Sequence, residues 1–247
     1  MDQPVFDHRE LTLDDVFEFA CYPGISCFNL CCYDVNLVLS PYDFLRLRRA
    51  LKIPSREFIE KFGELHLGDV TQLPVVSVRM NVHDFSCPFL QKEGCSVYED
   101  RPSSCRTYPL ARFAGRDEEG RPFEIYRIIR ETHCKGHFEK RPISVKEWIK
   151  EQGLEPYYAF NDLFGEIVFA RNRLDRPLSA DELDRIYIVC YELERFRPLV
   201  ESGELKDLFS AEEIESALND EEELLKLGLN WLKKTIFREV IQEEGGK

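Results

Sequence analysis

The first half of the chain alternates short apolar and polar stretches as β-strands do. Residues 33–39 alternate apolar and polar side chains, and residues 74–82 form a run rich in valine. Residues 106–114 and 122–130 are two apolar runs on either side of a polar turn. Such runs, bounded by turn residues, are typical of strands, and a pair of them around a short polar segment is typical of a hairpin. This half is therefore predicted to hold a small antiparallel sheet.

Short helices are predicted between these strands. One is centred on residues 13–19, where apolar side chains recur. Another begins where Ser40 precedes Pro41, because serine caps a first turn and proline lacks an N–H that would remain unpaired there. Ser55 is predicted to cap a further helix that ends at Phe62.

The second half of the chain reads as helices. Three capping boxes, in which a serine is followed three residues later by glutamate, each precede a helical apolar pattern. The boxes are Ser144 with Glu147, Ser179 with Glu182 and Ser210 with Glu213. The predicted helices span residues 144–152, 155–174, 179–197, 210–218 and 220–242.

Composition narrows the functional class. The chain has 247 residues and a net charge of −13, so a nucleic-acid partner or an anionic membrane surface is not expected. Its first residues form no secretory signal, and no window is apolar enough to span a bilayer. We therefore expect a cytoplasmic protein. Thiols in that compartment stay reduced, so its cysteines are interpreted as ligands or catalysts rather than as disulfides.

Eight of the nine cysteines gather in one stretch of the chain. They are Cys21, Cys27, Cys31, Cys32, Cys87, Cys95, Cys105 and Cys134. Thiolates are soft anionic ligands that suit zinc, iron and iron–sulfur clusters. Four thiolates make one tetrahedral site, so eight make either two sites or one polynuclear cluster. The ninth cysteine, Cys190, lies among apolar residues of a predicted helix and is expected in the core.

Alternatives to ligation remain open at this stage. The cysteines could be small buried hydrophobic residues. Because Cys31 and Cys32 are adjacent, they could bind separate metals, or one of them could stay unligated. His83, His133 and His137 are further candidate ligands, with exposed loop positions as the alternative.

Cations follow the second cysteine group. Arg101, Arg106, Arg112 and Lys135 could offset the negative charge of metal-bound thiolates, or they could pair with surface carboxylates. Asp43, Arg46 and Tyr108 could line a pocket near the metal, or they could serve only local folding. No catalytic residue is assigned, because the chain has no GxSxG, HExxH or P-loop motif.

Several phrases of the sequence resemble a known family. They are the cysteine group 27–32, the phrase CPFL at 87–90, GCSVY at 94–98, RPSSCRTYP at 101–109, and the segment 39–46 with Asp43 and Arg46. Over roughly residues 20–137 the chain resembles the YkgJ-type cysteine-cluster family, also described as zinc- or iron-chelating CxxCxxCC proteins. In its compact form that family spaces the first cysteines more closely than here, which sets Cys21 apart from the others.

The resemblance implies that all eight cysteines are metal ligands and that the metal is iron or zinc. A related branch is similar to flagellin lysine methylases, in which such a cluster is taken as an iron–sulfur centre. This chain has no GxGxxG nucleotide-binding fingerprint and no Cys-x3-Cys-x2-Cys motif of radical enzymes. A classical methyltransferase is therefore not supported.

These observations lead to one fold and three functional hypotheses. We predict an α-rich α+β protein, with an irregular metal-bound domain at residues 1–140, which holds the small sheet, and a helical region at residues 141–247. The first hypothesis is iron, or iron–sulfur, redox chemistry or modification of a protein. The second is a structural zinc module that binds a protein or peptide partner. The third is metal storage or delivery.

Overall fold

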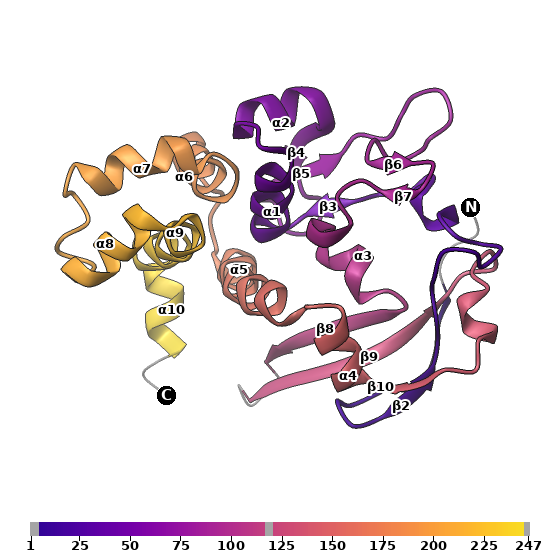
Figure 1. Cartoon of the computed structure of the whole chain (residues 1–247). Coiled ribbons are helices and arrows are strands. Elements are labelled where there is room, and N and C mark those ends of the chain that lie inside the picture. Colours follow the sequence, from indigo (N-terminus) through magenta and orange to yellow (C-terminus); the bar gives the residue numbers. More distant parts are fainter. Residues whose placement is uncertain (1–4, 117–120, 245–247) are drawn as a thin grey trace. The chain divides into compact units, whose positions relative to one another are not determined.

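A computed structural model describes residues 5–116 and 121–244 of the chain (Figure 1). The chain divides into two compact units, and each is built from two segments. Unit 1 comprises Met1–Leu37 and Arg79–Tyr158, and unit 2 comprises Val38–Val78 and Ala159–Lys247. The predicted boundary between residues 140 and 141 stays a prediction, since compact packing is a different property from independent folding.

Unit 1 holds short antiparallel sheets. One sheet has the strand order β1-β9-β8, β10 pairs with β2, and β6 pairs with β7. The strands are β1 (Val5–Phe6), β2 (Val16–Glu18), β6 (Leu90–Gln91), β7 (Gly94–Cys95), β8 (Leu110–Arg116), β9 (Pro122–Arg130) and β10 (Pro142–Ser144). The predicted hairpin is confirmed as β8 and β9, although β8 begins at Leu110. Its turn at residues 117–120 lies outside the described residues.

The helix predicted at residues 13–19 is wrong. Val16–Glu18 is strand β2, in which Phe17 lies opposite Ile143 of β10. Phe17 and Phe19 are both buried, while Val16 and Glu18 between and beside them are exposed. This spacing of two residues fits a strand and not a helix. A short apolar stretch is compatible with both patterns, so the sequence alone did not distinguish a strand from the predicted helix.

The helical segments of unit 1 are short. They are the 3-10 turns η1 (Leu30–Cys32), η2 (Tyr98–Asp100) and η3 (Gly136–Phe138), the helices α3 (Ser103–Thr107) and α4 (Val145–Glu151), and the start of α5 (Glu155–Arg173). A core of aromatic and aliphatic residues joins β2, β8, β9 and β10 to α4, with Phe19, Tyr126 and Trp148 among its buried members. Cys134 belongs to the same core.

Unit 2 is helical around one small sheet of order β3-β5-β4. Its strands are β3 (Val38–Leu39), β4 (Gly63–Leu67) and β5 (Pro74–Val78), so the predicted strands at 33–39 and 74–82 are shorter than expected. Its helices are α1 (Pro41–Leu51), α2 (Ser55–Phe62), most of α5, α6 (Ala180–Tyr191), α7 (Leu193–Glu201), α8 (Ala211–Asn219), α9 (Glu221–Thr235) and α10 (Arg238–Glu244). The fold is thus an α-rich α+β arrangement, as predicted.

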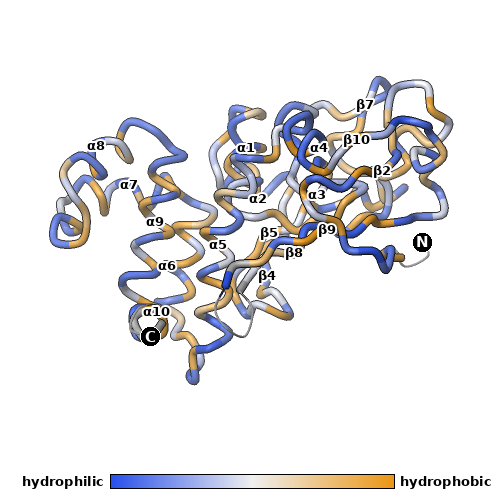
Figure 2. The backbone as a smooth tube through the Cα atoms, turned by 90° about the horizontal axis from the view of Figure 1, so that it is seen from below, coloured by the Kyte–Doolittle hydropathy of each residue, from blue (hydrophilic) through white to orange (hydrophobic). Residues whose placement is uncertain are grey.

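Helix caps account for much of this agreement. The three predicted boxes at Ser144, Ser179 and Ser210 all form, and Ser40 makes a fourth with Asp43. The predicted helix 179–197 is broken where Glu192 leaves the helical conformation, which separates α6 from α7. Apolar and polar residues alternate along α6 and α9 in Figure 2, as expected of helices that bury one face. Among the described residues, no helix combines the length and apolar character that a membrane crossing requires.

Ser55 has a different role from the predicted cap. Pro54 is the capping position of α2, and Ser55 instead donates its hydroxyl to Glu194 at 2.7 Å and its backbone N–H at 3.1 Å. Burial raises the pKa of Glu194, but these hydrogen bonds and the charge of Arg48 outweigh it and leave the pKa below its usual value.

Glu194→Gln is expected to remove a stabilisation that depends on pH. Because the folded pKa is depressed, the stabilisation is present above the unfolded pKa of about 4.3 and is lost as the pH falls through the folded pKa. Urea unfolding at pH 7 should show the variant less stable than the parent chain, and the gap should narrow as the pH is lowered below 4. An equal gap across this pH range would contradict this role of Glu194.

Candidate metal centre

All eight candidate cysteines lie in unit 1, and every cysteine of the chain is a free thiol. Most of them sit in loops or at the ends of very short elements, where the backbone is free to turn a side chain toward its neighbours. Cys31 and Cys32 end η1, Cys95 ends β7, and Cys105 lies in α3. Cys21, Cys31 and Cys105 are exposed, whereas Cys27, Cys87 and Cys134 are buried.

Cys31 is the thiol whose charge affects the pKa of several others. Burial, followed by the charge of Cys31, raises the pKa of Cys21 to about 11. Burial also raises the pKa of Cys87 and of Cys95, and Cys31 adds to the rise in each. The thiols from three separate segments of the chain therefore lie within electrostatic reach of one residue.

The adjacent pair Cys31 and Cys32 interacts directly. A hydrogen bond from Cys32 lowers the pKa of Cys31 to about 7, and the same bond is the main cause of a raised pKa at Cys32. Burial and the nearby Cys87 and Cys105 raise the pKa of Cys32 further. The vicinal pair therefore connects the first cysteine group to the second.

Backbone contacts bring the second group to this pair. The N–H of Cys87 donates to the carbonyl of Cys32 at 2.7 Å, and Tyr33 bridges to Ser86. The tight β6–β7 hairpin then turns the chain back, with Leu90 opposite Cys95. Gly94 in this turn has φ of 132°, a conformation that favours glycine.

Cys27 and Cys134 form a buried end of the thiol group. The backbone N–H of Lys135 donates to the Cys27 sulfur at 3.1 Å. Burial raises the pKa of Cys134, while a hydrogen bond with Tyr108 acts to lower it. The Tyr108 hydroxyl also lies 3.4 Å from Nε2 of His137. These sulfurs are thus held by hydrogen bonds as well as by packing.

Because Gly136 has no side chain, it lies very close to Phe19 and Ala20. A Cβ atom there would lie 2.5 Å from the Phe19 ring and 2.6 Å from the backbone oxygen of Ala20. Ala20 in turn donates its N–H to the Gly136 carbonyl. The close approach places the chain beside Cys21 against the chain that follows Cys134.

Gly136→Ala is therefore expected to destabilise unit 1 by about 1–3 kcal/mol, the usual range for overpacking a tight site. Differential scanning calorimetry would measure the shift. Gly165→Ala is the matched control, because a Cβ atom at Gly165 meets nothing within 4 Å. Equal stability of the two variants would contradict the tight approach.

The candidate cations separate into two kinds. Arg112 pairs with Glu124 at 2.6 Å, which is the alternative that the sequence left open. Arg101 and Arg106 are instead buried, 9% and 7% exposed, and both reach residue Gln152. Gln152 follows α4 and was missed, since nothing in its sequence surroundings marks it.

The candidate histidines are placed differently. His137 contacts Tyr108, and the centre of its ring lies 5.2 Å from the centre of the Phe19 ring. Nε2 of His133 is buried without a hydrogen-bond partner and lies 3.6 Å from the carboxylate of Glu131. His83 is exposed.

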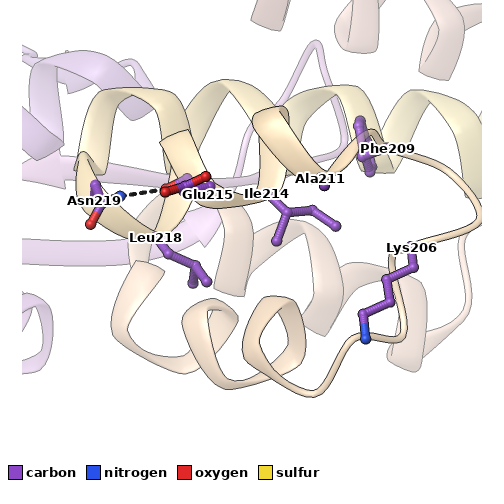
Figure 3. Close-up of a pocket in the computed structure, with 7 residues that line it drawn as sticks. All are labelled: Lys206, Phe209, Ala211, Ile214, Glu215, Leu218 and Asn219. Carbon is purple, nitrogen blue, oxygen red and sulfur yellow. Dashed lines mark hydrogen bonds between the residues drawn. The ribbon is translucent and has the colours of Figure 1, made fainter.

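Asp43 and Arg46 have structural roles within unit 2. Asp43 completes the capping box with Ser40, and Arg46 donates to the Tyr42 hydroxyl at 3.1 Å. A hollow of about 600 Å³ also lies in unit 2 and is shown in Figure 3. It is lined by Lys206, Phe209, Ala211, Ile214, Glu215, Leu218 and Asn219. With no cysteine or histidine in its lining, the hollow offers none of the thiolate chemistry of unit 1.

The donor set fits a soft metal by its chemistry. Free thiols dominate it, and they act on one another electrostatically from Cys21 through Cys31 and Cys32 to Cys105. Within the described ranges, no three cysteine, histidine or acidic side chains lie close enough together to hold an ion. The sulfurs are therefore neighbours rather than a closed coordination shell.

Comparison with known proteins identifies the class. Residues 20–141 match the family model described as "CxxCxxCC: Putative zinc- or iron-chelating domain". This segment of the chain belongs to that cysteine-cluster family, and the resemblance drawn from the sequence is confirmed. The match supports metal binding as the general function. No curated protein and no solved structure matches the chain.

Proposed function

We propose that unit 1 holds an iron or iron–sulfur centre through its eight clustered cysteines and that this centre has a redox role. When bound, such a group supplies one-electron transfer. The chain's own residues bind it, exclude water from its buried side and set the charge around it. The observation that carries this proposal is the arrangement around Cys31, which reaches thiols from both cysteine groups.

The arrangement favours a polynuclear centre over two separate ions. Two independent four-cysteine sites would need two groups of thiols that have no shared member. Cys31 instead acts on Cys21 of the first group and on Cys87 and Cys95 of the second. A single centre that several metal ions share accommodates such a linking thiol.

The uneven exposure of the thiols supports a redox role. Cys27, Cys87 and Cys134 are buried, while Cys21, Cys31 and Cys105 are exposed. An electron exchanged with a redox protein would pass most readily where the thiols are exposed. We therefore propose a protein or peptide partner that approaches there, in the cytoplasm.

A structural zinc module is the second candidate, and one observation favours it. Strands β6 and β7 have two residues each, and η1 has three. An isolated two-stranded hairpin of this kind is marginally stable in water. A closed zinc site would hold such segments together without any redox chemistry.

Metal and acid-labile sulfide analysis of protein purified without oxygen tests the proposal. Iron with matching sulfide supports it, and about two zinc ions per chain without sulfide support the structural candidate. Cys31→Ser should abolish metal binding. Cys190→Ala is the control, because Cys190 is buried in unit 2 at 2% exposure. Full metal content in Cys31→Ser would contradict the linking role of Cys31.

A further inference from the structure

Two guanidinium groups are buried beside the cysteines. Arg101 donates to the Tyr98 carbonyl and to the Gln152 side-chain oxygen, each at 2.6 Å, and its guanidinium lies 3.8 Å from the centre of the Tyr98 ring. Arg106 donates to the carbonyls of Arg101, Gln152 and Glu99. These acceptors are all neutral oxygens.

Neither arginine has a carboxylate partner among the residues that the structure describes. The two positive charges also repel each other. Burial is the main cause of the lowered pKa of Arg101, and the charge of Arg106 lowers it further. An arginine stays charged in a protein, and a buried charge without a counter-charge is strongly unfavourable.

Tyr98 and the sulfurs of Cys105 and Cys95 lie within electrostatic reach of Arg101. Cys105 and Cys95 act on Arg101 in the direction opposite to burial, and Arg101 acts on Cys21 in the same attractive sense. A free thiol with the usual pKa of about 8.5 is mostly neutral at neutral pH, whereas a metal-bound cysteine is a thiolate. The two guanidinium groups therefore lack full compensation until the thiolates form.

We infer that Arg101 and Arg106 are the counter-cations of a metal–thiolate centre with net negative charge, and that Arg101 acts on its sulfurs directly. The inference rests on the proposed function and adds the charge of the ligand that the site accepts. Each cysteine that binds the centre does so as a thiolate with one negative charge, and two buried guanidinium groups would offset part of the negative charge that such a thiolate-rich centre carries. The charge of Arg101 should therefore matter more for metal binding than the shape of its side chain.

Cobalt(II) binding to the full chain, measured without oxygen in competition with a chelator, tests this inference. Arg101→Gln is expected to weaken binding about 10–100-fold, the usual effect of removing a group that supports metal ligands. Arg101→Lys keeps the charge but loses the forked hydrogen bonds, and it should restore most of the affinity. Arg112→Gln is the matched control, since Arg112 is also largely buried, 15% exposed, but pairs with Glu124. The sulfur-to-cobalt absorption bands should shift in Arg101→Gln only.

Each outcome has a distinct meaning. Unchanged affinity in Arg101→Gln overturns the inference. Equal weakening in Arg101→Lys also overturns it, because metal binding would then require the forked hydrogen bonds of arginine and not its charge. If circular dichroism shows that Arg101→Gln does not fold, the affinities of Arg106→Gln and Arg106→Lys test the inference in its place. A parent chain that binds neither cobalt nor iron contradicts the proposed function itself.

Discussion

Stripping the metal from the purified protein is expected to unfold the cysteine loops of unit 1. Binding of structural zinc by small metal domains is worth about 10–16 kcal/mol of apparent free energy at neutral pH, and that energy is also folding energy. Hydrogen exchange before and after chelation should therefore show residues 21–32 and 87–105 losing most of their protection. The capped helices of unit 2 should keep theirs.

The backbone of these loops explains the expectation. Between β2 and β3 the only regular element of the described chain is η1, with three residues. Asn29 and Asp34 have positive φ angles, which asparagine and aspartate tolerate better than most residues but which interrupt any regular helix or strand there. Few long-range backbone hydrogen bonds hold the segment, among them that of Asp34 with the Phe85 carbonyl. Unchanged protection after complete metal removal would contradict the expected coupling.

The sequence predicted local features better than distant contacts. The capping boxes at Ser144, Ser179 and Ser210 depend on residues three positions apart, so their pattern is visible in the sequence. The hairpin of β8 and β9 is similarly local. Gln152 was missed because its role arises only when the end of α4 lies against Arg101 and Arg106. Nothing about a glutamine after a helix predicts that contact.

Phe17 and Ser55 show the same limit of prediction from the sequence, because the role of each depends on a residue far away in the chain. Phe17 belongs to a strand because Ile143 lies opposite it, more than a hundred residues later in the chain. Ser55 is not the cap because Pro54 occupies that position, and Ser55, as the first residue of α2, donates hydrogen bonds to the distant Glu194. For the metal site, cysteine spacing marked the candidates, but the linking position of Cys31 required the folded chain.

Trp148→Ala is expected to destabilise unit 1 by about 3–5 kcal/mol, the range for removing a large buried aromatic side chain. Trp148 is 4% exposed and packs its ring edge-on against Phe17 and Phe19. Its Nε1–H donates to the Thr107 carbonyl at 3.1 Å. Thr107 closes the helix that carries Cys105, and Phe19 lies two residues before Cys21. The side chain therefore connects α4 to both cysteine groups.

The same substitution should weaken metal binding, although Trp148 lies beyond the family match that ends at residue 141. Chelator competition would measure the affinity, and urea unfolding would measure the stability. Trp231→Ala is the matched control, since Trp231 is buried in unit 2 against Phe196 and should lose stability without losing affinity. Trp148→Phe separates packing from the hydrogen bond, because it keeps the ring contacts and removes only the donor to Thr107. Full affinity in Trp148→Ala would mean that residues 20–141 position the thiols without α4.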